Sequence, residues 1–145
     1  MSDSQTFGDA TPTEAWKVLA SDARAVLVDV RSKPEWSFVG VADLSGIGRE
    51  VIRLEWQTYP SMQVDPEFVA KLDGALRASG ADADTPVYFL CRSGARSASA
   101  AAAMARSGYR RCFNVVGGFE GARDEQGHRG TVEGWKAEKL PWGQS

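Results

Sequence analysis

The sequence predicts a single α/β domain whose parallel β-sheet is covered by helices on both faces. Three apolar segments rich in β-branched or aromatic residues, 25–30, 86–91 and 112–116, alternate with segments of helical pattern. Strands buried on both faces have this continuous apolar character, and alternation with helices is typical of parallel sheets. Ligands bind such sheets at the carboxyl ends of the strands. We therefore expect a functional site at that edge.

Length and composition agree with one domain that has a proper core. The chain has 145 residues, 43% hydrophobic and 25% charged, and a domain of about 150 residues buries roughly 68–70% of its unfolded surface. We expect residues 1–10 to be a flexible N-terminal segment, residues 11–142 to form the domain, and residues 143–145 to be a tail.

Charge and cysteine content exclude several classes of protein. A net charge of -2 gives no electrostatic footprint for nucleic acid. The sequence has no signal-peptide pattern and no run of about 18 apolar residues, so we expect a soluble, cytoplasmic protein without a membrane partner. Two cysteines and the single His128 make neither a disulfide scaffold nor a zinc site. We expect no metal and no cofactor.

The first elements follow from local signals. Thr11, Pro12 and Glu14 have the pattern of a capping box with a first-turn proline, which predicts a helix over 11–20. The strand at 25–30 should follow this helix.

The next part of the chain is less regular. Lys33-Pro34-Glu35-Trp36 is expected to form a turn or one short helix. Several glycines mark loops between residues 39 and 59, where 50–54 is the best strand candidate. Residues 65–80 combine an Asp-Pro start, an apolar stripe and a closing glycine, which predicts a helix.

The strand at 86–91 leads directly into a glycine-containing turn and an alanine-rich helix at 98–105. Cys91 ends this strand. A strand-to-helix turn of this kind directs backbone N–H groups inward as an anion-binding nest, and the N-terminus of the next helix adds positive potential. Such surroundings can lower a thiol pKa from about 8.5 to about 3.5–7.5. We expect Cys91 to be a nucleophile activated without histidine.

The residues after Cys91 are candidates for binding an anionic substrate. Arginine side chains and a nest of backbone amides both hold oxyanions. Cys112 stands at the start of an apolar strand and is expected to be structural. The substrate-binding candidates are Arg92, Ser93, Gly94, Ala95 and Arg96.

Residues 91–96, Cys-Arg-Ser-Gly-Ala-Arg, resemble the active-site loop of the rhodanese sulfurtransferases. The resemblance spans about residues 11–142, and the cysteine loop is its specific part. Supporting matches are Val28-Asp29-Val30-Arg31 with Glu35-Trp36, Asn114-Val115-Val116-Gly117-Gly118-Phe119, and Gly134-Trp135 with Leu140-Pro141-Trp142.

The resemblance implies a five-stranded parallel sheet and a specific chemistry. Cys91 would take a sulfane sulfur from a small anionic donor such as thiosulfate, become a persulfide, and pass the sulfur to cyanide or a thiol. The loop and Arg96 would hold the anion. Asp29 and Arg31 would support the loop from beneath as an ion pair, and a surface salt bridge is the alternative interpretation.

One segment departs from the family pattern. Many relatives have Gly-His and Pro-Gly between positions corresponding to 40–56, whereas this chain has neither, and 55–65 is longer than usual. The course of the chain between Gly40 and Asp65 is therefore not determined by the resemblance. Trp56 and Met62 either line the pocket or pack.

Two other functions are consistent with the sequence. Cysteine-based phosphatases and arsenate reductases also use a thiolate in an anion cradle, but they have five residues between cysteine and arginine, whereas four separate Cys91 from Arg96 here. A persulfide carrier or binding module acting on a protein partner is the other alternative. The sequence names neither the physiological donor or acceptor nor the oligomeric state.

Overall fold

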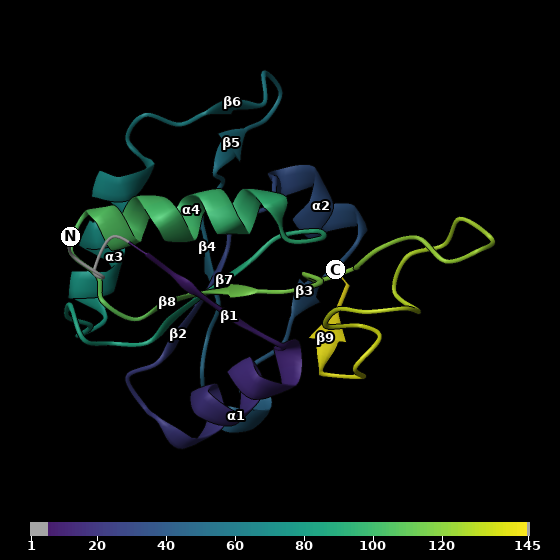
Figure 1. The fold of residues 1–145 in the computed structure, drawn as a ribbon, viewed down its shortest axis with the longest axis horizontal. Coiled ribbons are helices and arrows are strands. Elements are labelled where there is room, and N and C mark those ends of the chain that lie inside the picture. The colour runs from purple at the N-terminus through teal and green to yellow at the C-terminus, as the bar shows by residue number, and fades with distance from the viewer. Residues whose placement is uncertain (1–5, 145) are drawn as a thin grey trace.

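The computed structural model describes residues 6–144 and contains a five-stranded sheet in which all neighbouring strands are parallel (Figure 1). This confirms the predicted α/β architecture. The apolar segments of the sequence supply the three central strands, of which two are buried at every residue and the third at all but Phe113. From edge to edge the strands are β1 (Gly8–Ala10), β8 (Cys112–Val115), β7 (Val87–Leu90), β2 (Val26–Asp29) and β4 (Ile52–Arg53).

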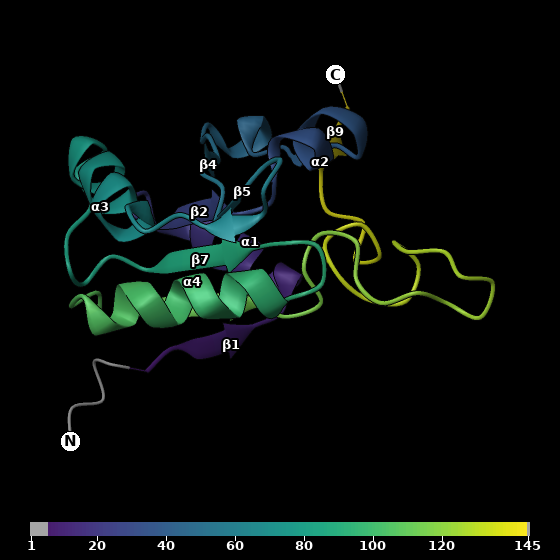
Figure 2. The same ribbon diagram turned by 90° about the horizontal axis from the view of Figure 1, so that it is seen from above.

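Four α-helices accompany this sheet in the described part of the chain: α1 (Pro12–Ser21), α2 (Lys33–Phe38), α3 (Phe68–Ala78) and α4 (Ala95–Arg106). Figure 2 looks onto the face that α3 and α4 cover, and α1 packs on the opposite face. The predicted helix start at Thr11 is confirmed, because Thr11 and Glu14 form the capping box.

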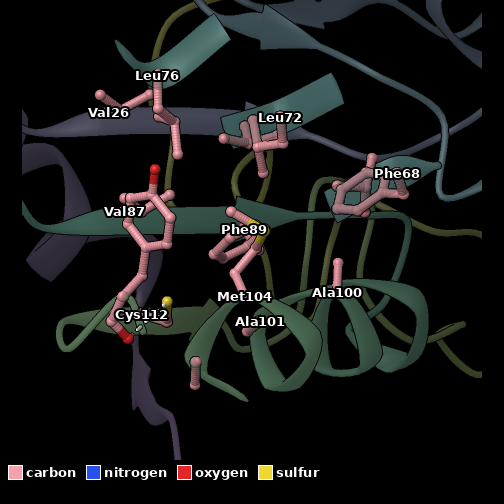
Figure 3. Packing of buried hydrophobic residues seen from close by; sticks show 14 of the residues in the cluster. Val26, Phe68, Leu72, Leu76, Val87, Phe89, Ala100, Ala101, Met104 and Cys112 are labelled. Carbon is pink, nitrogen blue, oxygen red and sulfur yellow. Dashed lines mark hydrogen bonds between the residues drawn. The ribbon is translucent and has the colours of Figure 1, made fainter. Parts of the chain in front are cut away.

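The domain has two hydrophobic cores, one on each face of the sheet, and alternate residues of the strands contribute to each. Figure 3 shows the core under α3 and α4, where Leu72 and Met104 pack toward Phe89 of β7. On the other face, Leu19 of α1 joins Leu90 in a second core. Successive strand residues point to opposite faces, so Phe89 and Leu90 belong to different cores.

The segment from Gly40 to Asp65, which the sequence left undetermined, contains short elements at the edge of the domain. β3 (Val41–Ala42) pairs with β9 (Trp142–Gly143), and the hairpin β5 (Gln57–Thr58) and β6 (Gln63–Val64) projects beyond the sheet (Figure 1). A 3-10 turn covers Ser45–Ile47.

Both expected ends of the domain need correction. Gly8–Ala10, expected to be flexible, form the edge strand β1, and Gly143, expected in the tail, belongs to β9. Gly-Asp-Ala has little strand propensity. The exposed edge of β8 pairs with it because that edge offers unpaired backbone groups. Residues 1–5 and 145 lie outside the described residues.

Two helix starts differ from the predicted ones. α3 begins at Phe68 rather than near Asp65, because the Asp65 carboxylate accepts the Glu67 N–H and closes a turn before the helix. α4 begins at Ala95, three residues before the alanine run. Within residues 6–144 no helix combines the length and apolar character of a membrane span, and a cytoplasmic location stays a prediction.

Replacing Leu72 by alanine should destabilise the protein by about 2–5 kcal/mol, because it leaves a cavity in the core between α3 and β7. The free energy of unfolding in urea measures this change. Val132→Ala is the matched control, since Val132 is 59% exposed and should change stability little. A Leu72→Ala effect as small as that of the control would contradict the packing described.

Candidate active site

Cys91 lies directly after β7, at the carboxyl edge of the sheet, and is 1% exposed. The turn that follows leads through Gly94 into α4. Gly94 has φ +119°, a conformation that glycine adopts readily and other residues rarely. Its N–H donates to Cys91 Sγ over 3.1 Å. The predicted strand, glycine turn and helix are therefore present, and a backbone amide of the turn reaches the sulfur.

Two further polar side chains connect to Cys91 from beneath α4. Cys91 Sγ lies 3.2 Å from Ser97 Oγ, and Ser97 Oγ donates to Asn114 Oδ1 over 2.5 Å. All three residues are buried. Ser97 and Asn114 have no role among the predictions from sequence. One signal in the sequence could have indicated Asn114: it is a polar residue within the apolar strand β8. It stands two residues after Cys112, so both side chains point to the face that α4 covers.

The other residues of the loop differ in their exposure. Arg92, Ser93 and Ala95 are exposed, whereas Gly94 and Arg96 are half-buried. The two residues that directly follow Cys91 are therefore open to solvent at the surface.

Arg96 is held by α2 rather than by the sulfur site. Its Nη1 and Nη2 donate to the two carboxylate oxygens of Glu35 over 2.6 and 2.9 Å. Glu35 also accepts from the N–H and hydroxyl of Ser32 in the capping box of α2. In the sequence, Glu35 stands out only as part of a family resemblance. Glu35 and Arg96 are 61 residues apart in the sequence, so no local pattern indicates that they form an ion pair.

The surroundings of Glu35 favour its charged form. Burial alone raises the carboxyl pKa, but the hydrogen bonds from Arg96 and Ser32 outweigh it and lower the pKa to about 2. The Arg96 pKa is raised, chiefly by its hydrogen bonds to Glu35 and to a lesser extent by the charges of Cys91 and Asp29. Arg96 therefore stays a cation with both terminal nitrogens engaged.

Asp29 and Arg31 form a second ion pair at the end of β2, and both side chains are fully buried. Arg31 Nη2 donates to Asp29 Oδ2 and to the Gly40 carbonyl, each over 2.7 Å. The guanidinium also lies 4.2 Å from the centre of the Phe119 ring. The alternative of a surface salt bridge is therefore wrong.

A glycine turn after β8 holds the backbone of the cysteine loop. The Phe119 N–H donates to the Cys91 carbonyl over 2.7 Å, and the Glu120 and Gly121 N–H groups donate to the Arg92 carbonyl over 3.0 Å. Gly118 permits this approach, because a Cβ there would lie 2.5 Å from the Cys91 oxygen. Asp29 and Arg31 thus connect to the loop through Phe119.

The other residues that the sequence singled out are Cys112, Trp56 and Met62. Burial raises the pKa of Cys112 to about 12, as expected of a structural thiol. Trp56 packs edge-on against Phe68, and Met62 lies in the hairpin turn and is 36% exposed. Within residues 6–144 no group of three or more potential metal ligands occurs.

This fold and cysteine loop define a known class of protein. The family model of the rhodanese-like domain matches residues 11–125, and the chain belongs to that family. Among solved structures, the crystal structure of Rv0390 from M. tuberculosis superposes with a TM-score of 0.84 at 46% identity, covering 97% of this chain and 99% of that one.

Curated relatives include uncharacterised proteins and sulfurtransferases. An uncharacterised protein of Rickettsia prowazekii is 35% identical over 130 residues, 90% of this chain and 92% of its own length. The thiosulfate sulfurtransferase GlpE of Actinobacillus succinogenes is 30% identical over 115 residues, 79% of this chain and 83% of its own length. The chain is thus a rhodanese-like domain with distant sulfurtransferase relatives.

Gly118→Ala should displace the cysteine loop, because the new methyl group would overlap the Cys91 carbonyl. Gly127→Ala is the matched control. Gly127 also has positive φ, but a methyl group there would meet no atom within 4 Å, so its substitution should cost only the left-handed strain of about 1–2 kcal/mol. We expect Gly118→Ala to lose clearly more stability in thermal unfolding. Equal losses would contradict the close approach.

Glu35→Gln should destabilise the protein at neutral pH, because it removes the negative partner of Arg96. Since the folded pKa of Glu35 is about 2 and the ordinary value is 4.5, its stabilisation is present above about pH 4.5 and is lost toward pH 2. Urea unfolding of both proteins between pH 2 and 7 tests this.

The stability difference between wild type and Glu35→Gln should therefore shrink as the pH falls. Glu125→Gln, at an exposed site, is the control and should show little difference at any pH. A Glu35→Gln effect that is constant over the whole range would contradict the ion pair.

Proposed function

We propose that the protein transfers a sulfane sulfur through a persulfide on Cys91. The observation that carries the proposal is the position of Cys91: its sulfur accepts the Gly94 N–H at the carboxyl edge of the sheet, where α4 begins. The sulfurtransferase relative supports the same reaction class.

In the first half-reaction the Cys91 thiolate attacks the outer sulfur of thiosulfate. The bond between the two thiosulfate sulfurs breaks, and sulfite leaves with the bonding electron pair. Cys91 then carries a persulfide. The Gly94 amide and the first-turn amides of α4, which have no acceptor within the helix, favour negative charge at this position.

In the second half-reaction an acceptor, cyanide or a thiolate, attacks the outer sulfur of the persulfide. The Cys91 sulfur leaves as a thiolate, which restores the starting enzyme. This is covalent catalysis in two displacement steps without a histidine base. Both displacements need the Cys91 thiolate to be stabilised, once as nucleophile and once as leaving group.

We assign recognition of the anionic donor to the loop backbone and to Arg92, whose side chain is exposed. The Arg96 charge is already paired with Glu35 at 2.6 Å, so its contribution to the donor is expected at longer range than a direct hydrogen bond. Asp29 and Arg31 are proposed to support the loop through Phe119 rather than to touch the substrate.

The test is the intact mass of the reduced protein after incubation with thiosulfate. We expect a gain of one sulfur atom that disappears when cyanide is added. Cys91→Ser should remain unmodified. Cys112→Ser is the matched control and should still gain the sulfur, because burial raises the Cys112 pKa to about 12 and its thiol donates to the Tyr109 carbonyl.

Other outcomes would overturn the proposal. A wild type that gains no sulfur but hydrolyses an aryl phosphate through Cys91 would be a cysteine-based phosphatase. A wild type that gains no sulfur from thiosulfate but does so from a persulfidated protein would keep the Cys91 persulfide and would overturn thiosulfate as the donor, making the protein a carrier that serves a protein partner.

A further inference from the structure

Cys91, Ser97 and Asn114 form a continuous chain of hydrogen-bonding groups beneath the first turn of α4. Ser97 Oγ lies between the other two, 3.2 Å from Cys91 Sγ and 2.5 Å from Asn114 Oδ1. The residues come from the end of β7, the start of α4 and the strand β8. Because Cys91 is 1% exposed and Ser97 0%, solvent gives little help in satisfying these groups.

The single hydroxyl proton of Ser97 serves one acceptor at a time, and its two oxygen acceptors are Asn114 Oδ1 at 2.5 Å and the Gly94 carbonyl at 3.2 Å. Asn114 Oδ1 accepts only, so the 2.5 Å contact places the Ser97 proton on the side of Asn114. In this arrangement a hydrogen bond between Cys91 and Ser97 over 3.2 Å has the Cys91 thiol as its donor. The observed network therefore suits the thiol form.

The thiolate requires the opposite direction. A thiolate sulfur cannot donate, so Ser97 must turn its proton toward Cys91, and Ser97 Oγ then needs a new donor. The Asn114 amide can supply one, since rotation by about 180° exchanges its Oδ1 acceptor for the Nδ2 donor. Asn114 Nδ2 lies near the turn that follows Cys91, 3.7 Å from the position of a Cβ on Gly94.

We propose that Asn114 is a positioning residue that acts through Ser97, reversing the hydrogen bonds of the chain when Cys91 changes between thiol and thiolate. An asparagine can serve both forms because its amide holds a donor and an acceptor at nearly equivalent places. An aspartate of the same shape, when ionised, accepts only and would keep the Ser97 proton away from the sulfur.

As applied to sulfur transfer, the inference rests on the proposed function. In the second half-reaction the bond between Cys91 Sγ and the outer sulfur breaks, and Sγ keeps the electron pair as the acceptor takes the outer sulfur. The Ser97 hydroxyl then donates to Sγ without transferring its proton. Charge-assisted hydrogen bonds of this kind are about twice as strong as neutral ones.

Charged groups around the sulfur keep their partners when the hydrogen bonds reverse. Arg96 interacts with the charges of Cys91 and Asp29 and is paired with Glu35, while Arg31 is paired with Asp29. Arg92 follows Cys91 at the surface. Substitutions at Ser97 and Asn114 leave all these groups in place, so their effects report on the hydrogen-bond chain.

The test is the rate of Cys91 alkylation by iodoacetamide between pH 5 and 10, followed by peptide mass spectrometry. This readout needs no sulfur transfer, so it is independent of whether thiosulfate loads the enzyme. We expect Ser97→Ala to slow alkylation at pH 7 about tenfold, because a hydrogen bond to a charged group has about this effect. The pH profile of the alkylation rate should move to higher pH.

Ser97→Thr should restore most of the rate because it keeps the hydroxyl. The matched control is Ser99→Ala, which removes an exposed hydroxyl from the same helix and should leave the rate and profile unchanged. Thermal unfolding of each variant shows whether it is folded at the assay temperature.

A double-mutant cycle then tests the role of Asn114. Asn114→Asp should slow alkylation about tenfold in the wild type but should have little further effect once Ser97→Ala is present, because it acts through that hydroxyl. An equal effect in both backgrounds would mean that the new charge acts directly on Cys91, and would overturn the proposal. An unchanged pH profile in Ser97→Ala would overturn it as well.

Discussion

The site depends on the close approach of two backbone segments, the cysteine loop and the glycine turn after β8. Three N–H groups of that turn, from Phe119, Glu120 and Gly121, donate to the carbonyls of Cys91 and Arg92. Only a residue without a Cβ fits at Gly118. These bonds fix the carbonyls of Cys91 and Arg92, and the Gly94 N–H of the same loop donates to the sulfur.

Positive and negative charges near Cys91 compensate one another more than the loop sequence suggests. Near Cys91, Arg31 is paired with Asp29 and Arg96 with Glu35, whereas Arg92 is exposed. The positive charge of Arg31 and Arg96 is therefore neutralised by these carboxylates. In the proposed mechanism, stabilisation of a thiolate then falls largely to oriented dipoles, namely the Gly94 amide, the start of α4 and the Ser97 hydroxyl.

Prediction from the sequence succeeded where the signal was local. The capping box at Thr11, the apolar strands and the passage from Cys91 into a helix all depend on neighbouring residues, and each was found. It failed at β1, because Gly8–Ala10 pair with β8 only through the backbone and carry no strand pattern of their own. An edge strand of this kind forms because the neighbouring strand offers backbone hydrogen-bonding groups, not because of its own side chains.

The sequence by itself determined that a cysteine ends a strand, that a glycine turn follows and that a helix begins there, because these features lie within a few consecutive residues. Only the tertiary structure decided which groups surround that cysteine. Glu35 meets Arg96 across 61 residues and Asn114 meets Ser97 across 17. The physical reason is that the packing of α2 and β8 around α4 brings these partners together, and no local sequence pattern indicates which residues will meet.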